Sequence, residues 1–162
     1  MSALSAAELQ VITDAAQNYF ARLTKQASRV TASYLAEHSE LPQFDYTGMI
    51  QVSGAYRGCV YFTAPKMMMR FLLLSVGETL QGDDIFMDAA GEIANTIAGN
   101  ARRHFGEKMQ ISVPTTLKRS EPGNLGNTGA NLLMHERPMV IRIQWQNLAA
   151  ALVVDLENAD QA

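Results

Sequence analysis

The amino-acid sequence predicts an α+β fold, in which an antiparallel sheet carries two or three helices packed on one face. Three segments place apolar residues at helical spacing, and several others alternate apolar and polar residues as half-buried strands do. Short turn sequences separate the later strands, which favours antiparallel pairing. Because the sequence shows neither an internal repeat nor a linker, residues 1–162 are expected to form one domain.

Composition and charge exclude several classes of protein. Hydrophobic residues make up 48% of the chain and charged residues 18%, which is typical of a globular rather than a disordered protein. The net charge of -3 and the scattered basic residues argue against nucleic acid binding. The single cysteine, Cys59, excludes an internal disulfide. With no signal-peptide pattern and no apolar run long enough to cross a bilayer, we expect a cytoplasmic protein without membrane insertion.

The first element is expected to be a helix over residues 6–25. Ser5 and Glu8 form a capping-box sequence ahead of apolar residues at helical spacing. Residues 30–34 could continue this helix or begin a strand, because their valine, threonine and tyrosine favour extended chain. Pro42 is expected to end whichever element precedes it.

A hairpin and a second helix are expected next. Tyr46–Ser53 and Arg57–Thr63 read as two strands around a turn at Ser53-Gly54. Pro65 suits a first helical turn, so a helix is predicted over Pro65–Val76. A methionine cluster more often packs in a core than forms a binding surface. We therefore expect most of this helix's large apolar residues to be core: Met67, Met68, Met69, Phe71, Leu72 and Leu73.

The last third of the sequence reads mostly as strands. Residues 109–113 alternate as a strand that ends at Pro114. The glycine- and proline-rich segment 118–131 is predicted to be a mobile loop. Three further strands are expected over Leu132–Glu136, Met139–Trp145 and Ala149–Leu156.

The segment Asp83–Gly106 organises the chain and reads as a long amphipathic helix. Its paired aspartates suit a helix start, and Gly106 can take the left-handed conformation of a helix end. At about 100° per residue, one broad arc is apolar and should face the core. The arc contains Phe86, Ala89, Ala90, Ile93, Ile97 and Ala101. The opposite side carries an outward stripe: Asp88, Glu92, Asn95 and Gly99.

The stripe could be a plain solvated surface, which explains most such patterns. Gly91 and Gly99 argue against this interpretation, because each costs about 1 kcal/mol relative to alanine inside a helix. Close approach of a partner would account for them. Glu92 and Asn95 lie one turn apart, where an amide can orient a water molecule and a carboxylate can pair with a partner's lysine. Such a pair could assist the hydrolysis of an acyl phosphate by positioning, but not that of a stable ester.

Other chemistries have weak support. His38, His104 and His135 are far apart in the sequence and lack metal-ligand spacing, so no metal site is expected. His104 falls on the inner arc of the long helix. Ser53-Gly54 is a turn rather than a nucleophile elbow, and the glycine-rich loop lacks the lysine of a phosphate-binding loop.

The sequence DAAGEIANTIAGNA at residues 88–101, followed by SVPTT at residues 112–116, resembles the CheX branch of the CheC/CheX chemotaxis phosphatases. That family carries an aspartate, a glutamate four residues later, an asparagine three residues further and a downstream proline. In this sequence the motif falls on Asp88, Glu92, Asn95 and Pro114. A single copy of the motif points to CheX, because CheC and the flagellar-switch phosphatases carry two.

The resemblance implies that the protein dephosphorylates a phosphorylated CheY-type response regulator. It assigns Asn95 to positioning the attacking water and Glu92 to contacting the regulator's lysine. We expect Asp88, Gly91, Gly99 and Pro114 to contribute to partner docking. The resemblance also implies that the magnesium ion belongs to the regulator, that the chain has no cofactor of its own, and that it forms a homodimer through sheet edges. The alternative is a non-catalytic module on the same fold that binds a receiver or another signalling protein.

Overall fold

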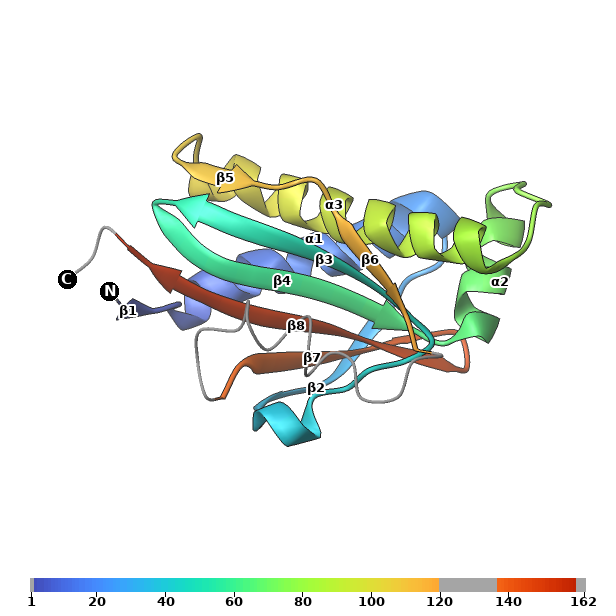
Figure 1. The fold of residues 1–162 in the computed structure, drawn as a ribbon, viewed down its shortest axis with the longest axis horizontal. Coiled ribbons are helices and arrows are strands. Elements are labelled where there is room, and N and C mark those ends of the chain that lie inside the picture. The colour runs from blue at the N-terminus through green and yellow to red at the C-terminus, as the bar shows by residue number, and fades with distance from the viewer. Residues whose placement is uncertain (1, 120–136, 160–162) are drawn as a thin grey trace.

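The computed structural model describes residues 2–119 and 137–159, which form three α-helices, a short 3-10 helix and one antiparallel sheet (Figure 1). The helical elements are α1 (Ala6–Thr24), η1 (His38–Glu40), α2 (Lys66–Ser75) and α3 (Asp83–Phe105). The strands are β1 (Ser2–Ala3), β2 (Arg29–Leu35), β3 (Tyr46–Gly54), β4 (Tyr56–Ala64), β5 (Met109–Ile111), β6 (Thr115–Lys118), β7 (Met139–Trp145) and β8 (Leu148–Asn158).

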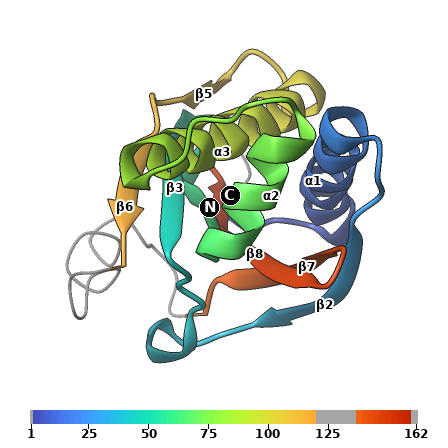
Figure 2. The ribbon, with the colours of Figure 1, turned by 90° about the vertical axis from the view of Figure 1, so that its right-hand side faces the viewer.

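The sheet has the strand order β2-β7-β8-β4-β3-β5, with β1 paired to β8 and β6 paired to β3. All three α-helices lie on the same face of this sheet (Figure 2). The main hydrophobic core fills the space between them, and a smaller buried cluster lies apart from it around Met49, Cys59 and Tyr61. The predicted fold class is therefore confirmed. No helix among the described residues is both long and apolar enough to span a membrane.

Local sequence explains most element boundaries. Ser5 and Glu8 form the expected capping box at the start of α1, and Lys25 ends the helix in a left-handed conformation. Residues 30–34, which sequence left open between helix and strand, belong to β2. The hairpin of β3 and β4 and the hairpin of β7 and β8 form as predicted.

Two predictions about the core and the sheet edge were wrong in part. On α2, Met68, Met69 and Leu72 are buried as expected, but Met67 and Phe71 are exposed, because the helix has only one face against the core. The strand expected to run to Pro114 ends at Ile111.

The short strand β6 was not predicted. After Ser112–Pro114 the chain returns to β3, so that β5 pairs with residues 52–54 and β6 pairs with residues 46–49 of the same strand. The two short strands thus form one interrupted edge. The rest of the predicted loop 118–131, and the predicted strand 132–136, lie outside the described residues.

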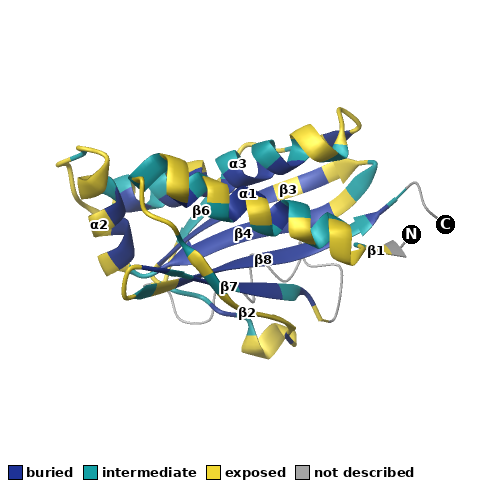
Figure 3. Ribbon diagram, turned by 180° about the vertical axis from the view of Figure 1, so that it is seen from behind, coloured by how far each residue is buried: buried dark blue, intermediate teal, exposed yellow. Residues whose placement is uncertain are grey.

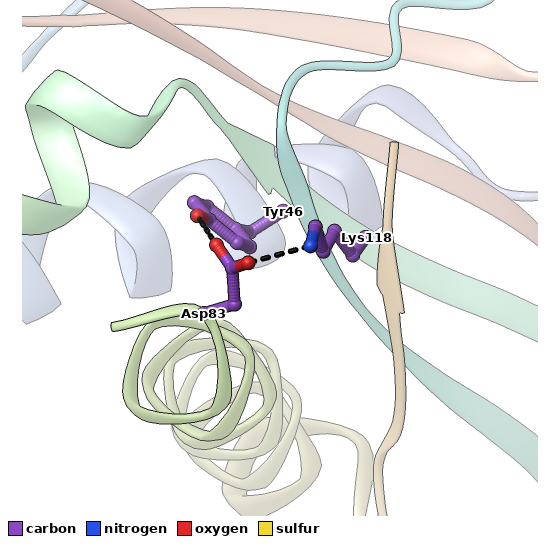
Figure 4. A network of polar contacts seen from close by, with 3 residues as sticks. All are labelled: Tyr46, Asp83 and Lys118. Atoms are coloured by element: carbon purple, nitrogen blue, oxygen red, sulfur yellow. Dashed lines mark hydrogen bonds and ion pairs between the residues drawn. The ribbon is translucent and has the colours of Figure 1, made fainter. Parts of the chain in front are cut away.

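The N-terminal end of α3 is joined to this edge by a polar network (Figure 4). The Tyr46 hydroxyl on β3 donates a hydrogen bond to Asp83 Oδ1. Lys118 Nζ on β6 lies 2.5 Å from Asp83 Oδ2. The hydrogen bonds from Lys118 and Tyr46 hold the pKa of the Asp83 carboxyl below its ordinary value of 3.8. The network therefore favours folding when Asp83 is ionised.

We expect Asp83→Asn to lower the free energy of unfolding at neutral pH, and this deficit to shrink as the pH falls. A carboxyl whose pKa is depressed by folding contributes stability above its unfolded-state pKa and loses it as the pH drops through the folded value. Urea unfolding across acidic and neutral pH measures the difference. The matched control is Asp84→Asn, which removes the neighbouring exposed carboxylate. If both variants depend on pH in the same way, the network does not stabilise the fold.

Candidate functional site

The helix α3 presents two chemically distinct sides, as its sequence predicts. Seven of its apolar residues, including Phe86, Ile93 and Ile97, are buried in the main core. Gly82 precedes the helix, and Gly106 follows it at the expected place. Gly106 has a positive φ of 98° with an extended ψ of 171°, so the helix does not end in the left-handed α conformation that was expected. Exposed and half-buried positions follow the outer side (Figure 3).

The predicted stripe lies on that outer side. Asp88 and Glu92 are exposed, whereas Asn95 and Gly99 are half-buried. Within the described residues, the side chains of Glu92 and Asn95 make no hydrogen bond with protein groups. The carboxylate and the amide are thus both available to an incoming molecule, one helical turn apart on a rigid element.

The prediction that Gly91 docks a partner needs correction, because Gly91 is buried by its own chain. A Cβ atom at this position would lie 2.9 Å from Thr116 Cγ2 and 3.2 Å from Pro114 Cβ. On β3, a Cβ atom at Gly48 would lie 2.3 Å from the carbonyl oxygen of Ala90 and 2.7 Å from Gly91 Cα. The glycines therefore allow α3 to approach the sheet closely.

Pro114 and Gly99 also have distinct positions. Pro114, half-buried in the segment between β5 and β6, covers Gly91 and so supports the helix beside Glu92. Gly99 has no atom of the chain near the place where its Cβ would be. Of the two helix glycines, only Gly99 leaves open space on the outer side for a partner.

Sequence reasoning missed Tyr19, which lies on α1 beside α3. Burial, together with the negative charge of Glu92, raises the pKa of the Tyr19 hydroxyl to about 12. The aromatic ring packs edge-on against Phe20, with ring centroids 5.5 Å apart. The sequence predicts that Tyr19 lies in a helix, but no pattern in the sequence links α1 to the face of α3 that carries Glu92.

An open hollow adjoins Asn95 along the C-terminal half of α3. Its volume is about 610 Å³, and its lining includes Asn95, Gly99 and Arg103.

Within residues 2–119 and 137–159, no three histidine, cysteine, aspartate or glutamate side chains are grouped to hold a metal ion. His104, expected on the inner arc, is exposed. The lining of the hollow offers an amide at Asn95 and a positive charge at Arg103.

Comparison with protein families shows which family the chain belongs to. The family described as Chemotaxis phosphatase CheX matches residues 46–131, more than half of the chain. This chain belongs to the CheX family. The CheX match includes all of α3 and Pro114, and hence the whole stripe described above. No curated protein matches the chain.

Solved CheX-related structures share the fold over nearly the whole chain. The chemotaxis protein CheX from Vibrio vulnificus is 17% identical, with a TM-score of 0.76 over 94% of this chain and 100% of that one. A CheX from Desulfovibrio desulfuricans is 16% identical, with a TM-score of 0.76 over 93% and 99%. A chain of the CheX-CheY-BeF3-Mg2+ complex from Borrelia burgdorferi is 12% identical, with a TM-score of 0.72 over 93% and 97%.

Proposed function

We propose that this protein accelerates the dephosphorylation of a phospho-aspartyl CheY-type response regulator, using Asn95 and Glu92 on the outer face of α3. The observation that carries the proposal is the placement of these two side chains. Both face outward, one turn apart, and neither makes a hydrogen bond within the described chain. Membership of the CheX family and the fold shared with a chain from a CheX-CheY complex support this choice of partner.

Asn95 is the residue that acts on the reaction. An acyl phosphate hydrolyses unaided, so placing a water molecule in line with the phosphorus atom is enough to accelerate its decay. The amide of Asn95 can accept a hydrogen bond from that water while its NH₂ group donates to a phosphoryl oxygen. The half-buried position of Asn95 restricts its side chain, which favours one orientation.

Glu92 sets the register of the complex. Its exposed carboxylate can pair with the lysine of the regulator's active site, and a charge-assisted hydrogen bond of this kind is short and directional. Because Asn95 lies one turn further along α3, a lysine held by Glu92 brings the neighbouring phosphoryl group to Asn95. Asp88 adds a second exposed carboxylate one turn before Glu92.

The direct test follows the decay of a phosphorylated CheY-type receiver with and without this protein. A small-molecule phosphodonor loads the receiver, and the loss of phosphoaspartate is timed at several concentrations of the protein. We expect the decay rate to rise with protein concentration and to saturate. Binding of a beryllofluoride-activated receiver without any change in decay rate would instead assign the protein to the non-catalytic receiver-binding role.

Gly99→Leu is expected to weaken receiver binding by tenfold or more, through bulk alone, while the fold is retained. The substituted side chain meets open space within the chain. Replacing a helical glycine also stabilises a helix by up to about 1 kcal/mol. Titration with an activated receiver measures the loss, and urea unfolding checks stability. Gly99→Ala is the matched control, with a much smaller effect on binding. Unchanged affinity in Gly99→Leu would show that the partner does not approach this position.

Three further expectations stay predictions. A homodimer through sheet edges is compatible with β2, which is an edge strand whose residues are mostly exposed. The magnesium ion required by the reaction is expected in the regulator rather than in this chain. A cytoplasmic location fits a partner of this kind.

A further inference from the structure

Two arginines extend the surface that begins at Asn95. Arg103 lines the 610 Å³ hollow beside Asn95 and also a second hollow of about 150 Å³ between α1 and α3. Arg22, near the end of α1, lines the second hollow. Both side chains are exposed. We call Arg22 and Arg103 the arginine pair.

Neither arginine of the pair forms an ion pair within the described chain. No carboxylate oxygen lies within 4.0 Å of either guanidinium group, and neither group makes a hydrogen bond there. Asp14 and Glu107 line the same hollows. Asp14 accepts a 2.8 Å hydrogen bond from Gln10 Nε2 instead. A guanidinium stays protonated in proteins, so both charges persist at any physiological pH.

Helix dipoles account in part for the positions of Arg22 and Arg103. Cations near the last turns of α1 and α3 interact favourably with the helix C-termini. That effect does not require arginines from two different helices to border a pair of hollows that share Asn100 and Arg103. The helix dipoles therefore do not explain why Arg103 shares one hollow with Asn95 and another with Arg22.

The charges along α3 are ordered around Asn95. Acidic residues occupy its N-terminal half and end at Glu92, whereas basic residues begin at Arg102. We propose, on the basis of the function proposed above, that the arginine pair binds a carboxylate-bearing surface of the phosphorylated receiver, on the side of the phosphoaspartate opposite the lysine held by Glu92. The two contacts together fix the direction in which the receiver lies along α3.

The chemistry of the partner's site supports this assignment. A phosphoaspartate that reacts with the help of Mg²⁺ lies beside carboxylates, because protein sites hold this ion through one or two of them and the phosphoryl group. The proposal requires part of these acidic surroundings to lie beyond Asn95 when the receiver's lysine is at Glu92 and its phosphoryl group is at Asn95. The exposed cations of this protein lie in the same direction.

The test measures kcat and KM for the phosphorylated receiver with Arg103→Glu and Arg22→Glu. Each variant should raise KM about three- to tenfold at low salt and leave kcat unchanged, because an exposed charge contact guides association rather than chemistry. The increase should shrink as salt is added, since screening weakens exposed contacts. Arg103→Lys should stay close to wild type because it keeps the charge.

Arg70→Glu is the matched control, since it reverses an exposed cation on α2, beside the opposite end of α3 (Figure 1). If the arginine pair variants behave like Arg70→Glu, the inference is overturned. If only kcat falls, the pair does not act in docking, and the inference is again wrong.

The proposed function can fail separately. Should wild type bind a beryllofluoride-activated receiver without accelerating decay, the same variants are compared by Kd, and a three- to tenfold rise still supports the arginine pair. Absence of both binding and acceleration with a panel of receivers overturns both proposals. Glutamine variants at the two positions, with urea unfolding, confirm that any effect is not a loss of folding.

Discussion

Asn95→Ala is expected to lower the dephosphorylation rate by on the order of 100-fold, towards the rate of the receiver alone. The variant removes the only group that we assign to orienting water, and it leaves Glu92 in place to bind the receiver. Affinity for an activated receiver should therefore change little while kcat falls. Alanine is also the better helix former, so the free energy of unfolding should stay the same or rise by a few tenths of a kcal/mol.

Single-turnover decay of the phosphorylated receiver at saturating protein measures this effect directly. Asn95→Asp serves as a control of equal size, because it keeps the shape of the side chain but loses the NH₂ donor and adds a negative charge close to the phosphoryl group. It should also be inactive. Full activity in Asn95→Ala would contradict the assigned role. If Asn95→Ala is inactive because it unfolds, the role is tested by Asn95→Asp instead.

Gly48→Ala should have the largest effect on stability. Overpacked cores typically lose about 1–3 kcal/mol in the free energy of unfolding, and we expect a loss towards the upper end of that range. The added methyl group would lie 2.3 Å from the carbonyl oxygen of Ala90 and 2.7 Å from Gly91 Cα. Both neighbours are backbone atoms, so no rotamer change can relieve the contact, and α3 must move away from β3.

Urea denaturation gives the loss as a change in midpoint. Gly99→Ala is the matched control, since the same substitution on α3 meets open space and should stabilise the protein. Because moving α3 displaces its outer face as well, dephosphorylation should slow in Gly48→Ala even under conditions where the protein stays folded. A stability equal to wild type would show that the helix is not held against the sheet at this position.

The fold was predictable where one periodicity dominates a long segment. The apolar arc of α3, the capping box of α1 and the alternation in β3 and β7 each point to one structure. On α2, by contrast, seven of the ten residues are apolar and three methionines stand in a row, so the sequence does not show which methionines face the core. The four-residue strand β6 follows Pro114 and is too short for its own pattern, and it is held in place by pairing with β3.

The candidate site was predictable in part for a similar reason. Helical spacing places Glu92 and Asn95 on the outer face whatever the rest of the chain does. The role of Gly91 was not readable, because a glycine that permits close approach looks the same in sequence whether its neighbour is Pro114 of its own chain or a partner. Tyr19 lies more than seventy positions before Glu92 in the sequence, and only the packing of α1 on α3 brings them together.

At Gly48 the approach of α3 to β3 is limited by main-chain atoms of α3, and at Gly91 it is limited by the side chains of Thr116 and Pro114. Main-chain atoms have no alternative rotamers, so the close approach at Gly48 does not depend on which apolar side chains fill the rest of the core. Drift in core sequence can then accumulate without altering where the outer amide and carboxylate stand. This is one physical route by which CheX proteins sharing only 12–17% of their residues with this chain can keep the same architecture.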